Sequence, residues 1–565
     1  MAHVAATDLA FAHPGGDTLF SGVSFRVSDG AHVGVVGANG VGKSTMFRVV
    51  AGLLPAADGD VRVGGELAYM PQDVGLGGAR DGETVRELLL AAAPARVADA
   101  GRRMLAAERD LAADGGDADA GMRLGEAMAD WSELGGYELE GRWDAACRRI
   151  VRAGLDEVGP RPVHALSGGE RKQLVLELLL ASEAQVLLLD EPDNFLDIPA
   201  KRWLEHRIAA SKKTILLISH DRDLLGAVTT GVLTLEGHGC WMHGASFRTY
   251  AEAREHRQQL LGDRLARWKE EERRLFHYYK TMKQRAAISE ALARRADAAE
   301  TRWRRFVDNG PPPAPVVDQQ IAVRLRGGDT ARKALTFRDT GVDRLVEPFS
   351  DEVHFGERVA LVGPNGSGKS HLLRLIAGEP IAHTGEAVLG PRVSPGLFSQ
   401  LNARPDFAGR GVLDIVEERT GAVEPAMRGL ARYGLQDAAR RRHDQLSGGQ
   451  RARLEILCLE LEGHTLLLLD EPTDNLDIDS AMALEAALER FEGTVLAVSH
   501  DRAFLRRMDR ALLLDHDGAV HALPDPETTL AALEDPRAVG ALPLAKRLSP
   551  STASAARRAT APRGR

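Results

Sequence analysis

The sequence predicts an α/β protein in which one parallel-sheet domain occurs twice and a charged helical hairpin joins the two copies. Strands alternate with helices in both halves, the same motifs recur at a constant spacing, and the segment between the halves has coiled-coil periodicity. The predicted parts are a first domain at residues 1–243, the hairpin at 244–320, a second domain at 321–535 and a basic, disordered tail at 536–565.

The composition bounds the class of protein. The chain has 565 residues, of which 44% are hydrophobic, so it can bury several cores. It contains no uninterrupted run of eighteen apolar residues, and its start lacks a basic region followed by an apolar core, so we expect neither a membrane span nor a signal peptide. The three cysteines are widely scattered, which excludes a disulfide framework and offers no clustered metal motif. We therefore expect a cytoplasmic protein.

The first half begins with strands and continues with alternating helices and strands. Strand-like segments run through SFRVSDGAHVGVV and recur around VRVG and ELAYM. Helical periodicity extends from about Thr84 to Ala153, and a helix after LSGGE, the apolar strand VLLLD, a helix from Ile198 and the strand TILLIS follow. Apolar strands that alternate with helices predict a parallel sheet covered on both faces.

The second half repeats this order in register. Asp190 and Asp470 are equivalent, and the motifs around them keep one constant offset in residue number. The segment between Gln72 and the first LSGG motif is about twice as long as the segment between Gln400 and the second. The first copy therefore carries a larger helical subdomain, whose mixed charge favours additional packing over a contact surface.

Each half contains one glycine-rich loop between a strand and a helix. The two loops read GANGVGKS and GPNGSGKS. Their glycines allow backbone N–H groups to surround the phosphates of a nucleotide at a helix N-terminus. Lys43 and Lys369 would reach the β- and γ-phosphates, and Ser44 and Ser370 would bind Mg²⁺. Two such matches, each between a strand and a helix, predict a P-loop nucleoside triphosphatase.

Each half also contains a buried strand that ends in two carboxylates, LLLDEP and LLLLDEP. Asp190 and Asp470 can hold Mg²⁺ through water, and Glu191 and Glu471 stand one residue later, where they can orient or deprotonate an attacking water. The alternative interpretation is that these carboxylates have only a structural role at the strand ends. Because the pattern occurs in both halves, the catalytic interpretation is the stronger one.

Two further motifs recur at fixed distances from these aspartates. LSGGE and LSGGQ stand equally far before Asp190 and Asp470, and each opens a helix whose N-terminal amides form a second anion-binding site. A histidine also follows each aspartate at the same distance, His220 in ISHDR and His500 in VSHDR. A single histidine at a strand end is usually a packing residue, but this combination of motifs favours a sensor of the γ-phosphate.

The segment between the halves is predicted to form two antiparallel helices. Apolar residues recur at coiled-coil spacing on both arms. They are Leu261, Leu265, Trp268, Leu275, Tyr279 and Met282 on the first arm, and Ile288, Leu292, Ala299, Trp303 and Phe306 on the second. Two helices with one apolar seam each can bury it only against each other, so the chain should turn around Gln284 to Ser289. A first arm from Tyr250 to Lys283 would be roughly 50 Å long.

The same segment is basic. Between Ser246 and Phe306 stand thirteen Arg and three Lys against seven Glu and two Asp, whereas the whole chain has a formal net charge of −9. The tail from Lys546 to Arg565 adds six basic residues and no acidic residue. A basic hairpin with interleaved aromatic residues indicates a polyanionic partner such as folded RNA. A solvated coiled-coil surface with i,i+4 ion pairs explains the segment equally well when it is considered alone.

The combination of GxxxxGKS, LSGG, DEP and SHD resembles that of the ATP-binding cassette (ABC) ATPases, over roughly 450 residues. The resemblance implies two P-loop ABC nucleotide-binding domains in tandem, joined by an α-helical hairpin linker, with two ATP molecules held between domains arranged head to tail. One site would combine Lys43, Asp190, Glu191 and His220 with Ser447 and Gly449. The other would combine Lys369, Asp470, Glu471 and His500 with Ser167 and Gly169.

Residue by residue, the resemblance assigns three groups. The catalytic residues would be Glu191, Glu471, His220 and His500. The ATP-binding residues would be Gly37, Asn39, Gly40, Gly42, Lys43, Ser44, Thr45, Gln72, Ser167, Gly168, Gly169, Gly363, Asn365, Gly366, Gly368, Lys369, Ser370, His371, Gln400, Ser447, Gly448 and Gly449. The Mg²⁺ ligands would be Ser44, Gln72, Asp190, Ser370, Gln400 and Asp470. The aromatic residue that stacks on the base falls near Phe11 and His13 in the first half and near Phe337 in the second.

Two fused cassettes, no membrane span and a charged helical linker together resemble the ABC-F subfamily, whose members bind ribosomes rather than drive transport. In that subfamily the hairpin enters the tRNA exit site, and its tip approaches the P-site tRNA and the peptidyl transferase centre. Carried over to this chain, the tip spans His277 to Glu290, with Lys280, Lys283 and Arg285 as candidate RNA contacts. The resemblance implies a monomer whose two cassettes pair with each other, either as an antibiotic-resistance factor that protects the ribosome or as a factor that modulates translation.

The chain departs from the subfamily pattern at a few positions. The usual EPTNHLD reads EPDNFLD at Glu191 to Asp197 and EPTDNLD at Glu471 to Asp477. His371 stands where the first copy has Thr45. These differences leave open whether the two sites turn over ATP equally. None of them removes a predicted Mg²⁺ ligand or glutamate, so we expect both sites to be competent.

Two other functions are weighed against this one. An ATP-hydrolysing subunit of an ABC exporter, working with a separate membrane permease, would share the cassettes but gives the hairpin no role. Chromosome and DNA-repair ATPases insert a coiled coil within each cassette or add zinc-binding cysteines, and this chain does neither.

Overall fold

The computed structural model describes residues 2–16, 18–72, 83–113, 118–236, 238–285, 287, 290–315, 323, 325, 332–399, 404–474, 476–534 and 546–549. The chain divides into two compact units. One comprises Met1–Met242 with Gln319–Arg565 and contains both cassettes, and the other comprises His243–Asp318. Within the described residues, no helix combines the length and the apolar character that are needed to cross a membrane.

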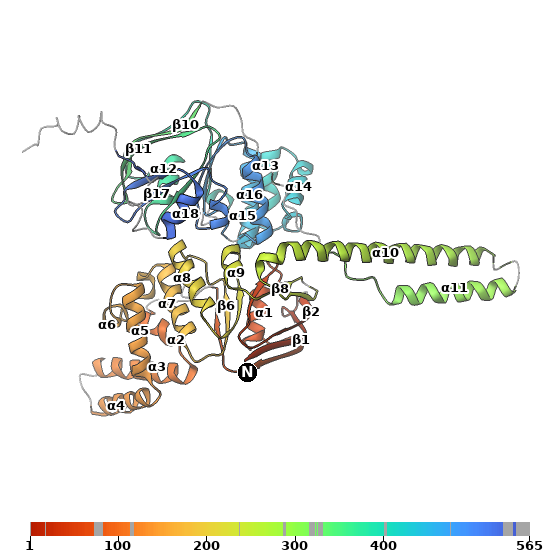
Figure 1. The fold of residues 1–565 in the computed structure, drawn as a ribbon, viewed down its shortest axis with the longest axis horizontal. Helices are drawn as coiled ribbons and strands as arrows, with labels where there is room; N and C mark the ends of the chain where they lie inside the picture. Colours follow the sequence, from red (N-terminus) through yellow and green to blue (C-terminus); the bar gives the residue numbers. More distant parts are fainter. Residues whose placement is uncertain are drawn as a thin grey trace, which may run out of the picture. The chain divides into compact units, whose positions relative to one another are not determined.

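The first cassette contains two sheets (Figure 1). An antiparallel sheet has the order β2-β1-β4 and consists of β1 (His3–Ala12), β2 (Thr18–Val27) and β4 (Asp58–Gly64). A larger sheet has the order β5-β6-β7-β3-β8-β9 and consists of β3 (His32–Val36), β5 (Leu67–Met70), β6 (Val186–Asp190), β7 (Thr214–Ile218), β8 (Gly231–Leu235) and β9 (Cys240–His243). The pairs from β5 through β8 are parallel, and every residue of β3, β6, β7 and β8 is buried. The predicted parallel sheet is confirmed.

The helices of the first cassette include a subdomain with its own core. They are α1 (Lys43–Val50), α2 (Val85–Ala91), α3 (Ala95–Ala113), α4 (Ala118–Glu133), α5 (Gly136–Ile150), α6 (Leu155–Val158), α7 (Gly168–Ala181), α8 (Ile198–Ala209) and α9 (Arg222–Val228). Trp131 and Trp143 are both 1% exposed and lie 6.2 Å apart between ring centroids, within a cluster that includes Leu174 and Leu178 of α7. The larger helical subdomain of the first copy is therefore packed onto its cassette, as predicted.

The second cassette repeats the same plan with fewer helices before its LSGG motif. Its antiparallel sheet has the order β11-β10-β13, with β10 (Lys333–Val342), β11 (Val346–His354) and β13 (His383–Leu389). Its larger sheet has the order β14-β15-β16-β12-β17-β18-β19, with β12 (Arg358–Val362), β14 (Pro395–Phe398), β15 (Leu466–Asp470), β16 (Thr494–Val498), β17 (Arg510–Leu514), β18 (Val520–Leu523) and β19 (Lys546–Arg547). Its helices are α12 (Lys369–Ile376), α13 (Val412–Thr420), α14 (Val423–Arg432), α15 (Gly448–Glu462), α16 (Ile478–Arg490), α17 (Arg502–Leu505) and α18 (Pro526–Glu534).

The strand β19 differs from the prediction of a disordered tail. Lys546 and Arg547 pair antiparallel with β18, and the backbone N–H of Leu548 donates to the carbonyl oxygen of Val520 at 2.8 Å. The edge of β18 offers backbone donors and acceptors that a short segment of almost any composition can pair with. Composition alone gave no signal for this pairing. The rest of the tail lies outside the described residues.

The unit from His243 to Asp318 is a helical hairpin, α10 (Tyr250–Arg285) and α11 (Glu290–Asp308). Figure 1 shows the two helices side by side. The rings of Trp268 and Phe306 stack at 5.3 Å between centroids, and those of Tyr279 and Trp303 stack at 5.7 Å. The predicted seam is confirmed for these residues, and α10 ends at Arg285, within the predicted turn. Ala286, Ile288 and Ser289 of that turn lie outside the described residues. Because α10 has 36 residues and α11 has 19, only the outer part of α10 is paired within the hairpin.

Candidate ATP sites

Both glycine-rich loops lie between a buried strand and a helix, as the sequence predicts. In the first cassette, β3 leads into residues 37–42 and α1 begins at Lys43. In the second cassette, β12 leads into residues 363–368 and α12 begins at Lys369. Each loop therefore ends at the N-terminus of an eight-residue helix, where free backbone N–H groups and the helix dipole favour a phosphate.

The first glycine of each loop is required by its surroundings. Gly37 has a φ of 151°, and a Cβ atom there would lie 2.6 Å from the carbonyl oxygen of Leu235. Gly363 has a φ of 144°, and its Cβ atom would lie 2.2 Å from the carbonyl oxygen of Leu514. Real Cβ atoms do not approach a backbone oxygen so closely, and L side chains rarely adopt this φ. The loops can therefore follow this path only with glycine at these positions.

Both P-loop lysines are buried and donate to their own loops. Lys43 Nζ donates to the carbonyl oxygens of Gly37 and Ala38, at 2.7 and 3.2 Å. Lys369 Nζ makes the equivalent bonds in the second loop, at 2.9 and 2.8 Å. Burial lowers the pKa of both ammonium groups, although nearby carboxylates oppose this shift. An ammonium group held at a buried loop is well placed for a ligand that carries several negative charges, such as a triphosphate.

A serine and an aspartate meet next to each loop. Ser44 Oγ donates to Asp190 Oδ1 at 3.1 Å, and Ser370 Oγ donates to Asp470 Oδ1 at 3.1 Å. Burial raises the pKa of both aspartates. Mg²⁺ usually takes one or two protein ligands and completes its shell with phosphate oxygens and water. The residues present therefore fit a magnesium ion bound together with a nucleotide.

The two predicted catalytic glutamates have strained backbones. Glu191 has a φ of 48° and Glu471 a φ of 50°, in the left-handed region of backbone conformation, which residues other than Gly, Asn and Asp seldom occupy. Their backbone N–H groups donate to the adjacent strands, to Ile218 at 2.9 Å and to Val498 at 3.0 Å. Burial, followed by the charges of nearby aspartates, raises the pKa of Glu191 to about 7. Burial also raises the pKa of Glu471.

Each predicted histidine lies beside the glutamate of its own cassette. His220 Nε2 is 3.9 Å from Glu191 Oε1, and His500 Nε2 is 3.6 Å from Glu471 Oε1. Burial, followed by the charge of the P-loop lysine, lowers the pKa of His220 to about 3 and that of His500 well below its usual value. Both imidazole rings are therefore neutral at pH 7, and each can donate one hydrogen bond while it accepts another.

Gln72 lies close to the same glutamate in the first site. Its Nε2 donates to Glu191 Oε2 at 2.6 Å, so the contact joins the residues that follow the ends of the neighbouring strands β5 and β6. The equivalent residue, Gln400, lies outside the described residues.

Both LSGG motifs open a helix as predicted. Ser167 and Ser447 cap α7 and α15, and each forms a capping box with the residue three positions later, Glu170 or Gln450. The two helices have 14 and 15 residues, so each has a full helix dipole behind its N-terminal glycine amides.

Each LSGG motif contributes to a cavity that also contains the P-loop of the other cassette. The first cavity has a volume of about 380 Å³ and is lined by His13, Leu19, Asn39, Gly40, Gly42, Lys43, Ser44, Thr45, Gln72, Glu191, His220, Ser447, Gly448 and Gly449. The second has a volume of about 460 Å³, and its lining includes Ser167, Gly168, Gly169, Asn365, Gly366, Gly368, Lys369, Ser370, His371, Asp470, Glu471 and His500, together with Glu191 and His220, which line both cavities. The predicted site residues that are described thus gather in two composite cavities. Gly37 and Gly363 do not line a cavity but determine the path of their loops. Asp190 does not line a cavity either, but it accepts a hydrogen bond from Ser44, which does.

The prediction for the base-stacking residues is wrong for two of the three candidates. Phe11 is 6% exposed and packs on Phe20, with ring centroids 6.2 Å apart. Phe337 is 1% exposed and packs on Phe349 at 4.8 Å. Both point into the cores of the antiparallel sheets, because alternate residues of a strand face opposite sides. His13 lines the first cavity.

The structure also brings residues to the cavities that the motifs did not identify. The backbone N–H of Asn39 donates to Asp477 Oδ2 at 3.2 Å, and Asn365 Nδ2 donates to the carbonyl oxygen of Phe195 at 3.2 Å. Both contacts join the P-loop of one cassette to the segment after DEP in the other. The sequence signal was present, since EPDNFLD and EPTDNLD directly follow the predicted glutamates, but it does not reveal contacts across cassettes.

Comparisons with known proteins identify the family of both cassettes. The ABC transporter family matches residues 20–194 and 346–474, one match in each cassette. An antibiotic resistance protein of Mycobacteroides abscessus is 43% identical over 553 residues, which cover 93% of this chain and 100% of that protein. The energy-dependent translational throttle protein EttA of Escherichia coli K12 is 32% identical over 517 residues, which cover 88% of this chain and 89% of EttA.

A solved structure shares the fold. The archaeal ribosome recycling factor aABCE1, in its complex with the ribosomal stalk protein aP1, aligns with a TM-score of 0.58 and 18% sequence identity over 98% of each chain. The paired family matches, the two relatives and the two composite cavities lead to one conclusion. The chain belongs to the ABC-F subfamily of ATP-binding cassette ATPases.

Proposed function

We propose that the protein binds and hydrolyses ATP at its two composite sites and uses the closed, ATP-bound form to act on the ribosome. The observation that carries this proposal is the basic hairpin of α10 and α11, inserted in the sequence between two cassettes whose P-loop and LSGG motifs line two cavities. The names of the two relatives support it, because one is an antibiotic resistance protein and the other a translational throttle. A cytoplasmic location follows from the ribosome as the proposed partner. The proposal includes the division of the chain into a first cassette at residues 1–243, the hairpin at 244–320, a second cassette at 321–535 and a tail at 536–565.

The proposed roles within a site follow from the contacts. Lys43 and the amides of its loop bind the phosphates of ATP, while Ser447 and Gly449 of the other cassette hold the γ-phosphate from the opposite side. Mg²⁺, held by Ser44, Asp190 and Gln72, would neutralise charge that develops on the phosphates.

In the same site, Glu191 orients the attacking water and accepts its proton, for which a pKa of about 7 is suitable. The neutral imidazole of His220 contacts the γ-phosphate. Lys369, Ser370, Asp470, Glu471 and His500, with Gln400, Ser167 and Gly169, have the same roles in the second site.

The proposed RNA contacts lie at the tip of the hairpin. Lys283 Nζ donates to Tyr279 OH at 2.7 Å and lies 5.1 Å from the centroid of the same ring. Lys280 and Arg285 stand on the same last turns of α10. We propose that these cations meet ribosomal RNA and the P-site tRNA, with the hairpin in the tRNA exit site and its tip toward the peptidyl transferase region.

The ribosome is tested as a partner by trapping the ATP-bound form. Glu191→Gln and Glu471→Gln together should abolish hydrolysis while both sites still bind ATP, so the variant should sediment with 70S particles in the presence of ATP. The matched control adds Lys280→Glu, Lys283→Glu and Arg285→Glu, which reverse the charge of the tip and leave both cavities unchanged. Sedimentation should fall at least tenfold in this control, because several phosphate contacts are lost. A trapped variant that stays off 70S particles with ATP would refute the proposal.

Resistance and modulation of translation are separated by a susceptibility panel. Cells with and without the protein are compared for growth on macrolides, lincosamides, streptogramins and pleuromutilins. We propose protection of the ribosome as the first role, because the antibiotic resistance protein is the more similar of the two relatives compared above, with 43% identity against 32%. A raised inhibitory concentration for one class supports protection, whereas unchanged values with altered translation in the same cells support the second role.

A further inference from the structure

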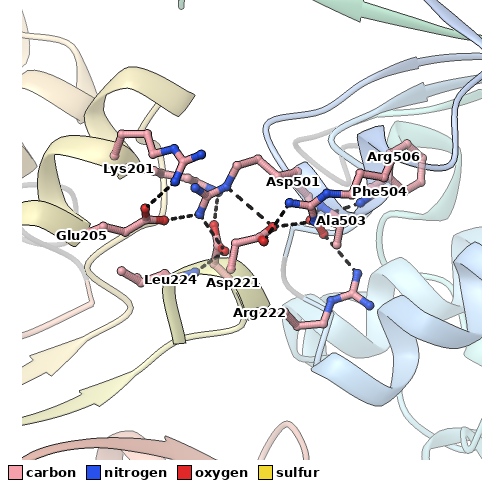
Figure 2. Close-up of polar contacts among 12 residues, drawn as sticks. Lys201, Glu205, Asp221, Arg222, Leu224, Asp501, Ala503, Phe504 and Arg506 are labelled. Atoms are coloured by element: carbon pink, nitrogen blue, oxygen red, sulfur yellow. Dashed lines mark hydrogen bonds and ion pairs between the residues drawn. The ribbon is translucent and has the colours of Figure 1, made fainter. Parts of the chain in front are cut away.

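Lys201 of α8 lies at the interface between the two cassettes (Figure 2). Its ammonium group is held by the first cassette and contacts the second. Its Nζ is 3.1 Å from Asp221 Oδ2 and donates to the backbone carbonyl oxygen of His500 at 3.2 Å. The side chain is 11% exposed. Burial would lower the pKa of this ammonium group, but the carboxylates of Asp221, Asp193 and Asp501 outweigh burial and raise it. Lys201 is therefore charged, and its charge has little water to stabilise it.

The carbonyl group that Lys201 contacts belongs to a residue of the second ATP site. The backbone N–H of His500 donates to Glu471 Oε2 at 3.0 Å, and its imidazole Nε2 lies 3.6 Å from Glu471 Oε1. Lys201 thus contacts the backbone carbonyl of His500, while the backbone N–H and the ring of His500 both contact Glu471, the predicted catalytic glutamate. A shift of this backbone would move the glutamate and the histidine together.

The other side of Lys201 leads back to the first ATP site. Asp193 follows Glu191 by two residues and is 5% exposed, and both residues line the second cavity together with Lys201. Burial raises the pKa of Asp193, and the charge of Lys201 opposes this shift. A buried carboxylate and a buried ammonium group stabilise each other, so a movement of the segment after Glu191 changes the environment of Lys201.

The equivalent connection in the opposite direction is missing from the sequence. At the offset that relates the motifs of the two cassettes, Thr473 stands in place of Asp193 and Ala481 in place of Lys201. Ala481 lies on α16, the equivalent of α8, but its methyl side chain carries no charge and no donor. The backbone of His220 therefore receives no ammonium group from position 481.

We propose that Lys201 is a positioning residue through which the first cassette sets the geometry of His500 and Glu471, so that the two ATP sites are coupled in one direction. The inference rests on the proposed function, because it takes Glu191 and Glu471 as the residues that drive hydrolysis at separate sites. It predicts that removal of Lys201 slows hydrolysis more at the site of Glu471 than at the site of Glu191, because Asp221, the neighbour of His220, keeps Arg502 within 3.4 Å.

The experiment measures single-turnover hydrolysis of labelled ATP by the full chain in two backgrounds. Glu191→Gln leaves only the site of Glu471 active, and Glu471→Gln leaves only the site of Glu191. Lys201→Ala should slow hydrolysis about tenfold in the first background, the order expected for the loss of one charge-assisted hydrogen bond, and less than about twofold in the second. ATP affinity should stay within about twofold in both, because Lys201 acts on the backbone of His500 rather than on the nucleotide.

Two further variants secure the interpretation. Lys201→Ala with Asp193→Thr reproduces the residues of the second cassette and leaves no unpaired carboxylate at position 193, so it gives the same test if the single variant does not fold. Arg506→Ala is the matched control, since Arg506 joins the cassettes through two hydrogen bonds to Asp223, at 2.9 and 3.0 Å. It should slow neither background more than the other. Equal slowing by Lys201→Ala in both backgrounds, or no slowing in either, would overturn the inference. Hydrolysis that survives in the double Glu→Gln variant would instead overturn the assignment of the glutamates.

Discussion

Arg222 donates to Glu485 across the interface between the cassettes, with Nη1 3.2 Å from Oε2, and Arg502 and Glu205 repeat this pair in the opposite direction. Both arginines and both glutamates are related by the same offset in residue number that relates the ATP motifs. The two pairs differ in burial, because the side chain of Arg502 is 2% exposed and that of Arg222 is 19% exposed. Arg502 also lies within 3.4 Å of Asp221 and 3.7 Å of Asp223.

Arg502→Ala should therefore destabilise the protein more than Arg222→Ala. The first substitution leaves Glu205 with Arg202 at 3.2 Å and Asp221 with Lys201 at 3.1 Å, but it removes the more deeply buried cation and should cost about 3 kcal/mol. The second leaves Arg507 within 4.0 Å of Glu485 and should cost about half as much. Urea unfolding followed by circular dichroism measures both free energies of unfolding. Equal losses for the two variants would show that the two pairs contribute alike in spite of their different burial.

The sequence predicted the parallel sheets and the motif residues from local patterns, whereas the pairing of the cassettes into composite cavities came from the resemblance to ABC ATPases. Strands such as VLLLD are apolar throughout, so they could only be buried on both faces, and the motif residues follow these strands directly. The constant offset then implied that the second cassette would repeat the first. Gly37 illustrates the limit of this reasoning, since the motif predicted a glycine but not its contact with Leu235.

The ion pairs between the cassettes could not be predicted, because their partners are far apart in the chain. Arg222 and Glu485 are separated by 263 residues, and nothing in ISHDR or in the sequence of α16 indicates that the two will meet. The positions of Phe11 and Phe337 were mistaken for a related reason. Strand alternation decides which face each ring takes, and the bulges in β1 and β10 make that alternation unreadable from sequence.

Trp303 is the residue on which the outer part of the hairpin depends. Its ring stacks on Tyr279 and lies 5.2 Å from Phe276, and its Nε1 donates to Glu272 Oε1 at 3.2 Å. Trp303→Ala should cost about 3–5 kcal/mol of local stability, and Trp303→Phe, which keeps a ring but loses the hydrogen bond, should cost about 1 kcal/mol.

Hydrogen exchange of the full chain measures this effect. Amides of α11 should exchange faster in Trp303→Ala, while those of β6 and β15 should be unchanged, because the cassettes keep their own cores. Binding of ATP by the cassettes serves as the control and should be retained. Exchange in α11 that does not change would show that the aromatic stack does not hold the hairpin.

Gly37→Ala should remove ATP binding from the first site and leave the second site intact. The new Cβ atom would meet the carbonyl oxygen of Leu235 at 2.6 Å, so either the loop or β8 must move. Gly262→Ala in α10 is the matched control, because a Cβ atom there meets no atom within 4 Å and alanine is favoured over glycine in a helix by about 1 kcal/mol.

Equilibrium binding of a fluorescent ATP analogue counts the sites in each variant. We expect one site for Gly37→Ala and two for Gly262→Ala, which should also unfold at a slightly higher temperature. Two intact sites in Gly37→Ala would mean that the loop has room for a side chain after all.

Glu462, at the end of α15, should make a contribution to stability that depends on pH. It accepts from Arg419 Nε at 2.7 Å and lies 2.9 Å from His464 Nε2. Burial alone would raise the pKa of Glu462, but these two partners outweigh burial and lower it to about 2 from an ordinary value of 4.5. Because the folded state binds this proton less tightly than the unfolded state, the contribution is complete above pH 4.5 and is lost as the pH falls toward 2.

Glu462→Gln should therefore lower the free energy of unfolding at pH 7 by about 1 kcal/mol, a value reduced for the partial exposure of the side chain. The difference from the unsubstituted protein should shrink as the pH is lowered from 5 through about 4, where urea unfolding can still be followed. Glu418→Gln is the control, since Glu418 pairs with Arg410 with 62% of its side chain exposed, where water screens the pair. A Glu462→Gln difference that stays constant between these pH values would show that the carboxylate is not stabilised by Arg419 and His464.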